Sequence, residues 1–141
     1  MKLFSWNCRG LGKPQAVRAL KKLLLNHNPD IAMLMETKLQ AQDRVLSKML
    51  PIGLLTNSCV IDCNISGGGR AGGIMLLWNN DVTLNIANAN KNFFDFYIRA
   101  PDNSMNWRAT GIYGFPSSNA KTLTCDLIKD LYQNQIGRAH V

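Results

Sequence analysis

Two polar side chains with oxygen donors end two short apolar runs in the N-terminal part of the chain. Asn7 ends the run that begins at Phe4, and Glu36 ends the run that begins at Asp30. An apolar run that ends in polar residues is typical of a buried parallel strand whose C-terminal end opens onto a site. In open α/β sheets ligands bind at that edge, so we expect the two side chains to stand together.

An amide oxygen and a carboxylate are hard donors that suit a hydrated Mg²⁺ or Mn²⁺. The sequence therefore predicts a divalent-metal role for Asn7 and Glu36. The alternative from spacing alone is that both residues cap turns or face solvent, as most Asn and Glu residues at strand ends do.

The segments around these two residues alternate between strand and helix. Strands are predicted over residues 2–8 and 30–36. Between them, apolar residues at helical spacing predict a helix over residues 15–26, with Pro14 at its first position. This order gives a β-α-β unit, which pairs the two strands in parallel through a right-handed crossover.

The rest of the chain predicts a mixed α/β architecture. A second helix is predicted over residues 42–50 and strands over 54–62 and 74–78. The glycine-rich segment 67–73 precedes a strand rather than a helix, so it is no phosphate-binding loop, and we expect a flexible link there. Short links between the strands at 81–89, 93–99 and 107–113 predict antiparallel hairpins, followed by a helix from residue 117 to about 132.

Composition narrows the class of protein and of partner. The 141 residues favour one domain, and 46% of them are hydrophobic, so a core can form. The net charge of +7 favours nucleic-acid phosphate, or an acidic membrane surface, as partner. No apolar stretch is long enough to span a bilayer, and the N-terminus is a poor signal peptide. We expect a nuclear or cytoplasmic protein that is not secreted, with its four irregularly spaced cysteines as free thiols.

The amino-acid sequences of two of these segments resemble those of a known family. Trp6-Asn7-Cys8-Arg9-Gly10-Leu11, followed by Glu36-Thr37-Lys38, resembles the opening of the endonuclease/exonuclease/phosphatase superfamily, which has the DNase I-like fold. It is most similar to the apurinic-endonuclease-like domain that begins the polyproteins of LINE-type (non-LTR) retrotransposons of plants. The resemblance implies the N-terminal part of a four-layer α/β sandwich, with a mixed sheet and outer helices.

The same resemblance implies roles for three residues. Asn7 and Glu36 would lie at a divalent metal, Mg²⁺ or Mn²⁺, and Tyr113 would contact the scissile phosphate through its hydroxyl. The alternative for Tyr113 is a core tyrosine whose hydroxyl is hydrogen-bonded within the protein. Some family members carry an Asp two residues after the Asn; here that position is Arg9, so one carboxylate near the metal is absent.

The implied parent protein is a Mg²⁺-dependent DNA endonuclease that nicks DNA for target-primed reverse transcription. Its partners would be DNA and, in the parent polyprotein, a downstream reverse transcriptase. Two alternatives stay open: another phosphoesterase of the same superfamily, such as a phosphatase of inositol lipids, or a non-catalytic basic fragment that binds nucleic acid.

Two later family motifs are missing from the chain: a Gly-Asp-Phe-Asn-like strand end and a Ser-Asp-His-like one. We therefore expect residues 1–135 to be a truncated domain that lacks the catalytic base, nicks negligibly and is poorly soluble through its exposed apolar surface. Residues 136–141 do not continue a helical pattern, since Gly137 interrupts it. They match the translation of a common sequencing adapter, so we expect a non-native tail.

Overall fold

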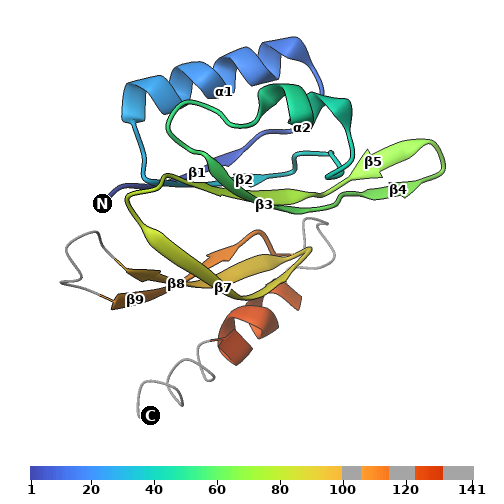
Figure 1. Cartoon of the computed structure of the whole chain (residues 1–141). Helices are drawn as coiled ribbons and strands as arrows, with labels where there is room; N and C mark the ends of the chain where they lie inside the picture. Colours follow the sequence, from blue (N-terminus) through green and yellow to red (C-terminus); the bar gives the residue numbers. More distant parts are fainter. Residues whose placement is uncertain (100–105, 115–122, 132–141) are drawn as a thin grey trace.

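Two β-sheets pack face to face at the centre of the molecule, with helices on the outer sides (Figure 1). The computed structural model describes residues 1–99, 106–114 and 123–131. In chain order the elements are β1 (Leu3–Asn7), α1 (Pro14–His27), β2 (Ile31–Met35), α2 (Arg44–Met49), β3 (Asn57–Ile61), β4 (Asn64–Ser66), β5 (Gly69–Ala71), β6 (Ile74–Trp78), β7 (Thr83–Asn90), β8 (Phe93–Arg99) and β9 (Asn106–Ile112). Residues 123–131 are helical as well.

The first sheet has the strand order β1-β2-β6-β3. β1 and β2 are parallel, as the predicted β-α-β unit requires, and Asn7 pairs with Met35 at their common C-terminal end. β6 runs antiparallel to both β2 and β3. Because Glu36 directly follows Met35, the pairing places Asn7 and Glu36 at the same edge of the sheet.

Helix α1 covers the outer face of this sheet. It begins at Pro14, whose fixed φ suits a first helical position. It ends at Asn28, which adopts the left-handed conformation while its N–H donates to the Leu24 carbonyl, 2.8 Å away. Leu20 and Leu24 are buried against apolar side chains of the sheet and of α2. Apolar burial at helical spacing thus fixes α1 over the strands whose ends form the candidate site.

The second sheet is an antiparallel meander, β7-β8-β9. Its inner face packs on β2 and β6 through a core of Ile31, Met33, Ile74, Leu76, Val82, Phe94, Phe96 and Ile98. Gly111 of β9 faces Met33 of β2: an added Cβ at this position would lie 2.2 Å from Met33 Sδ. The absence of a side chain at Gly111 therefore lets β9 lie directly against β2, which brings the segment after β9 close to the segment after β2.

The mixed α/β class and the strand order along the chain are confirmed, with shifted boundaries. Helix α2 is shorter than the predicted 42–50, and β3 begins at Asn57 because residues 52–55 form a bridged turn. The prediction of a flexible link over residues 67–73 was wrong. Residues 64–71 form the β4–β5 hairpin, whose turn residues Gly67 and Gly68 have φ of 55° and 80°.

Other expectations concern single residues and the C-terminal part. Cys8, Cys59, Cys63 and Cys125 are free, as predicted. Asp95 of β8 is only 2% exposed, and Arg108 and Thr110 of β9 donate hydrogen bonds to its carboxylate. In the described part of the chain, no helix has the length and apolar character needed to cross a membrane. The start of the last helix and the boundary at residues 135 and 136 lie outside the described residues.

Candidate functional site

The segments after β1 and β2 stay bonded to each other beyond the strands. The Cys8 N–H donates to the Met35 carbonyl and the Gly10 N–H donates to the Glu36 carbonyl, each at 2.8 Å. The Leu11 N–H then donates to the Thr37 carbonyl, also at 2.8 Å. The structure therefore brings the two predicted metal residues, Asn7 and Glu36, together on a backbone that hydrogen bonds hold in place.

Backbone strain is concentrated at this edge. Arg9, Glu36 and Lys38 have φ of 51°, 56° and 56°, in the left-handed region that side chains disfavour. The other non-glycine residue with positive φ in the described ranges is Asn28, which ends α1. Strained residues persist where the surrounding structure over-determines them, and they cluster at functional sites. The sequence did not indicate this feature, because no local pattern marks it.

The Asn7 amide is oriented by its own turn. Its Oδ1 accepts a hydrogen bond from the Arg9 N–H at 3.1 Å, and the residue is exposed. The Glu36 carboxylate is half-buried, and no described residue donates a hydrogen bond to it or forms an ion pair with it. Because partly buried carboxylates gain from a cationic partner, this pair of oxygen donors fits a divalent cation.

The negative charge of Glu36 contributes to the raised pKa values of two other groups, the Cys8 thiol and the Tyr113 hydroxyl. Burial, with the charge of Glu36 adding to it, raises the pKa of the Cys8 thiol to about 12, although a backbone hydrogen bond at Met35 opposes the rise. Burial raises the pKa of the Tyr113 hydroxyl, and Glu36 again adds to the effect. The charge of Glu36 thus acts on both groups, since a nearby negative charge disfavours the ionised form of a thiol or a phenol.

Tyr113 comes from the second sheet. It directly follows β9, and its N–H donates to the Asn92 carbonyl at 2.8 Å. Tyr113 and Asn92 line a small pocket of about 130 Å³ together with Asp62, Asn64, Gly73 and neighbouring residues. The structure thus places Asn7 and Glu36 at one sheet edge and Tyr113 within the electrostatic influence of Glu36, while the roles of all three stay a prediction.

Two glycines, Gly72 and Gly73, directly precede β6 and bond to the segment after β2. The Thr37 N–H donates to the Gly73 carbonyl at 3.0 Å, and the Lys38 N–H donates to the Gly72 carbonyl at 2.9 Å. A Cβ on Gly73 would lie 2.6 Å from Thr37 Oγ1, and Thr37 is fully buried. The start of β6 can therefore lie against the end of β2 only because residue 73 has no side chain.

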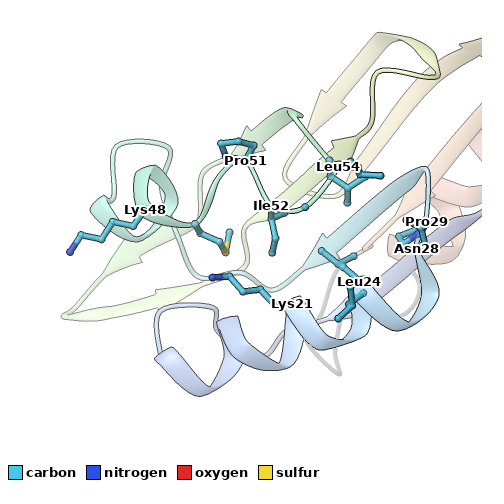
Figure 2. Close-up of a pocket in the computed structure, with 12 residues that line it drawn as sticks. Lys21, Leu24, Asn28, Pro29, Lys48, Pro51, Ile52 and Leu54 are labelled. Atoms are coloured by element: carbon cyan, nitrogen blue, oxygen red, sulfur yellow. The ribbon is translucent and has the colours of Figure 1, made fainter.

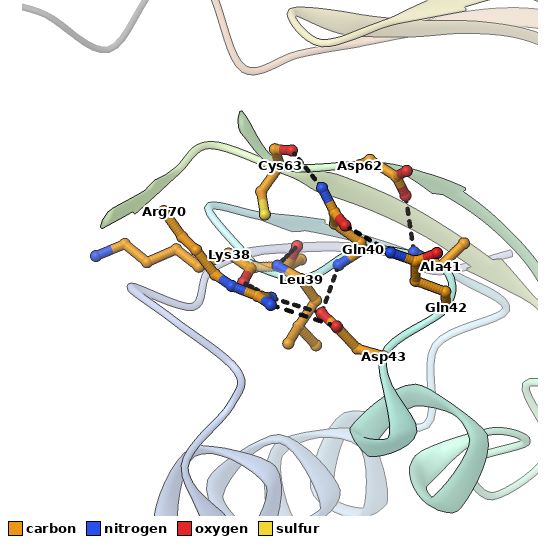
Figure 3. Close-up of polar contacts among 10 residues, drawn as sticks. Lys38, Leu39, Gln40, Ala41, Gln42, Asp43, Asp62, Cys63 and Arg70 are labelled. Carbon is orange, nitrogen blue, oxygen red and sulfur yellow. Dashed lines mark hydrogen bonds and ion pairs between the residues drawn. The ribbon is translucent and has the colours of Figure 1, made fainter. Parts of the chain in front are cut away.

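A basic pocket of about 590 Å³ opens between the segments that follow β1 and β2 and the start of α2. Its lining includes five cationic side chains, those of Arg9, Lys13, Lys38, Arg44 and Arg70, and one acidic side chain, that of Asp43. The acidic group is already paired: Arg70 Nη1 lies 2.6 Å from Asp43 Oδ2 (Figure 3). The remaining cations give the pocket a strongly positive character, which suits phosphate groups.

The Arg70 contacts were not foreseen from the sequence. Arg70 also donates to the Lys38 carbonyl at 3.1 Å, so it ties the β4–β5 hairpin to the segment after β2. The Asp62 carboxylate strengthens the same connection, since it accepts a hydrogen bond from the Ala41 N–H at 2.7 Å (Figure 3). These partners are distant along the chain, so no local motif could have indicated them.

The described residues supply only part of a metal coordination shell. Among them no group of three or more His, Cys, Asp or Glu side chains comes together. At the strand ends Asn7 and Glu36 offer one amide and one carboxylate, and Arg9 occupies the position that a further Asp takes in some family members. Mg²⁺ commonly keeps several waters and uses few protein carboxylates, so this donor set is compatible with it.

Comparisons with known proteins point to one family. The model of the Endonuclease/Exonuclease/phosphatase family matches residues 4–131. No curated protein matches the chain by sequence. The endonuclease domain of TRAS1, a telomere-specific non-LTR retrotransposon, superposes with a TM-score of 0.58 at 14% identity, over 95% of this chain and 53% of that one.

Two further solved structures share the fold. The human Nocturnin catalytic domain with bound sulfate anion gives a TM-score of 0.63 at 14% identity, over 97% of this chain and 59% of that one. The AP endonuclease LMAP from Leishmania major gives 0.52 at 18% identity, over 79% of this chain and 40% of that one. The chain therefore spans between 40% and 59% of the length of these three structures.

Proposed function

Because the chain belongs to the endonuclease/exonuclease/phosphatase family, we propose that it is the N-terminal part of a Mg²⁺-dependent DNA endonuclease. The observation that carries the proposal is the placing of Asn7 and Glu36 at one sheet edge, with Tyr113 of the facing sheet near enough that its pKa, raised by burial, is raised further by the charge of Glu36. A pocket with five cationic side chains opens next to the segments that follow β1 and β2. The likeness to the TRAS1 endonuclease domain supports a source in a non-LTR retrotransposon, in which the nick would prime a downstream reverse transcriptase. That the source is a LINE-type element of plants is proposed from the sequence resemblance alone.

Each residue has a chemical task in this proposal. The Asn7 amide and the Glu36 carboxylate hold Mg²⁺ or Mn²⁺, which when bound supplies a Lewis acid that offsets charge on the phosphate and the leaving oxygen. The Tyr113 hydroxyl is protonated at neutral pH, as burial only raises its already high pKa, so it can donate a hydrogen bond to a phosphate oxygen. The cations of the basic pocket bind phosphates of the DNA backbone next to the cleaved one.

We also propose that the 141-residue chain by itself does not nick DNA. Hydrolysis needs a group that orients or deprotonates the attacking water. In the described ranges His27 is the one histidine, and it lies at the end of α1, whereas the candidate site lies beyond the start of that helix. The chain therefore contributes to binding of metal and phosphate, and the rest of the domain supplies the base.

Nicking of supercoiled plasmid tests both parts. The longer reading frame that contains this chain should nick plasmid with Mg²⁺, and Glu36→Gln should abolish nicking while leaving DNA binding in place. The 141-residue chain should not nick. Robust Glu36-dependent nicking by the short chain would contradict the inactivity, and nicking by the long protein that ignores Glu36→Gln would contradict the proposed site.

Two alternatives are separated by the same assay. The family that matches the chain also includes phosphatases, which supports another phosphoester as the alternative substrate. In that case the long protein would release phosphate from small phosphoesters and leave plasmid intact. The basic pocket alone favours a non-catalytic fragment that binds nucleic acid. That function would appear as salt-sensitive DNA binding without cleavage by either protein.

A further inference from the structure

An apolar groove lies on the outer face of the helical layer, away from the candidate site. It has a volume of about 660 Å³ and runs between the C-terminal half of α1 and the segment that follows α2 (Figure 2). Leu24, Met49, Ile52 and Leu55 line it and are buried. The groove and the basic pocket have no lining residue in common. The groove is thus a separate feature of the surface.

Two leucines at the groove are almost fully exposed. Leu25 is 83% exposed and Leu54 is 71% exposed, the highest values among the large hydrophobic residues that the structure describes. Single exposed leucines are ordinary on protein surfaces. Here two of them border one concavity in which Leu24, Met49, Ile52 and Leu55 form a buried apolar floor, while Lys21, Lys48 and Asn28 contribute polar groups. Two exposed leucines beside an apolar floor make this surface a candidate interaction site.

The charges around the groove have one sign. Lys21 and Lys48 line it from α1 and α2, and no acidic residue is among its lining residues. Neither helix contains an Asp or Glu: α1 carries Arg18, Lys21 and Lys22, and α2 carries Arg44 and Lys48. An apolar groove with one lysine on each side is complementary to a ligand that presents a row of apolar side chains with acidic side chains beside it.

We propose that this groove binds an acidic amphipathic helix of another protein. Leucine-type side chains spaced at i, i+3, i+4 and i+7 would contact Leu25, Leu54 and the apolar floor, while flanking Glu or Asp side chains meet Lys21 and Lys48. Nucleic acid fits less well, because phosphates gain nothing from apolar walls and no aromatic residue lines the groove for base stacking. A flat membrane surface does not fill a concave groove. The proposal is independent of the proposed endonuclease.

Fluorescence anisotropy with a designed peptide tests the proposal on the full 141-residue chain. The probe is a fluorescein-labelled amphipathic peptide of about four helical turns, with Leu on one face and Glu on its flanks. A peptide of the same composition in scrambled order is the control ligand. We expect the amphipathic probe to bind about tenfold more tightly than the scrambled one or better. Equal binding of the two peptides would overturn the proposal.

Matched protein variants locate the site. The double variant Leu25→Asp, Leu54→Asp should weaken binding about tenfold or more, and Leu123→Asp, at a leucine that is 53% exposed and outside the groove, should leave it unchanged. Lys21→Glu with Lys48→Glu should weaken binding and flatten its salt dependence. If the aspartate pair lowers the melting temperature, Leu25→Gln with Leu54→Gln replaces it, and the same loss of binding is expected.

Competition separates the rival ligands. Duplex DNA and phosphatidylserine vesicles should fail to displace the peptide at concentrations that leave the protein soluble. Displacement by DNA that persists in the Leu25→Asp, Leu54→Asp variant would show that the cationic helices bind polyanions in general. Displacement by vesicles that the leucine variant abolishes would assign the surface to membranes. Either result would contradict a helix-binding groove.

Discussion

Glu36 at the end of β2 lies close enough to Tyr113 after β9 that its negative charge contributes to the raised pKa of the tyrosine hydroxyl. The two residues belong to different sheets and are far apart in sequence. The packing of β9 on β2 brings them near each other, and at Gly111 the Met33 side chain occupies the space that a Cβ would take. The sheet-to-sheet contact thus assembles the candidate site as much as the strand order does.

Replacing Glu36 by Gln should lower the pKa of Tyr113, because the nearby negative charge is removed. The pKa should stay above the ordinary tyrosine value, since burial is the larger cause and persists. Absorbance of tyrosinate during an alkaline titration measures this, with Tyr113→Phe used to subtract the other tyrosines. An unchanged Tyr113 pKa in Glu36→Gln would mean that the two groups are not neighbours.

The same shift makes a prediction for stability against pH. A pKa that is raised in the folded state means that the protonated form stabilises folding below the ordinary tyrosine pKa, and this contribution is lost as pH rises through the folded value. The free energy of unfolding should therefore begin to fall near pH 10, the pKa of an unperturbed tyrosine. The Tyr113→Phe variant should lack this loss. Urea unfolding at several alkaline pH values measures it, and a wild-type profile identical to that of Tyr113→Phe would contradict the shift.

Gly73→Ala should destabilise the protein by about 2 kcal/mol more than Gly68→Ala. Both glycines have positive φ, 88° and 80°, so the conformational strain of an alanine is similar. Only Gly73 is crowded, since its Cβ would lie 2.6 Å from Thr37 Oγ1, whereas nothing lies within 4 Å of a Cβ on Gly68. Urea unfolding of the two variants measures the difference. Equal losses would mean that residue 73 has room for a side chain.

Asp95→Ala should cost about 3 kcal/mol, because it leaves the Arg108 guanidinium without its buried partner. Arg108 Nε donates to Asp95 Oδ1 at 2.9 Å, and a second bond joins Nη2 to Oδ2. Asp43→Ala is the comparison variant, since it removes the ion pair with Arg70, whose side chain is 39% exposed against 19% for Asp43, and it should cost less. It also removes the acceptor of the Gln40 N–H. Thermal melts compare them, and similar small effects would show that the Asp95 pair is not a structural requirement.

Cys8 should resist alkylation by iodoacetamide at neutral pH, because its pKa of about 12 leaves almost no thiolate and the side chain is buried. Cys125 is exposed and should react in the folded protein. Peptide mapping by mass spectrometry gives the extent of each modification. In denaturant the two cysteines should react alike, and rapid labelling of Cys8 in the folded state would contradict its burial at the strand end.

The apolar runs of β1 and β2 and the helical spacing between them were sufficient to predict the parallel pair, and with it the adjacency of Asn7 and Glu36. The approach of Tyr113 followed only from the family resemblance, because it depends on how β9 packs on β2. The β4–β5 hairpin was missed because its glycines carry no apolar alternation, although a two-residue glycine turn favours a hairpin.

Other features of the site could not be read from local sequence at all. The left-handed conformations of Arg9, Glu36 and Lys38 depend on backbone bonds between the segments after β1, after β2 and before β6. The ion pair of Arg70 with Asp43 joins residues 27 positions apart, so it emerges only from the tertiary fold. Long-range contacts of this kind set the electrostatics of the basic pocket.

Paramagnetic broadening by Mn²⁺ tests the central claim most directly, since it reports the position of a bound cation without requiring activity. In isotope-labelled protein, Mn²⁺ should broaden the side-chain amide of Asn7 and the backbone signals around Glu36 first, and an excess of Mg²⁺ should restore them. Glu36→Gln should abolish this localised effect, whereas Asp81→Asn should not. Broadening that centres on other carboxylates, or that is the same in Glu36→Gln, would contradict a metal site formed by Asn7 and Glu36.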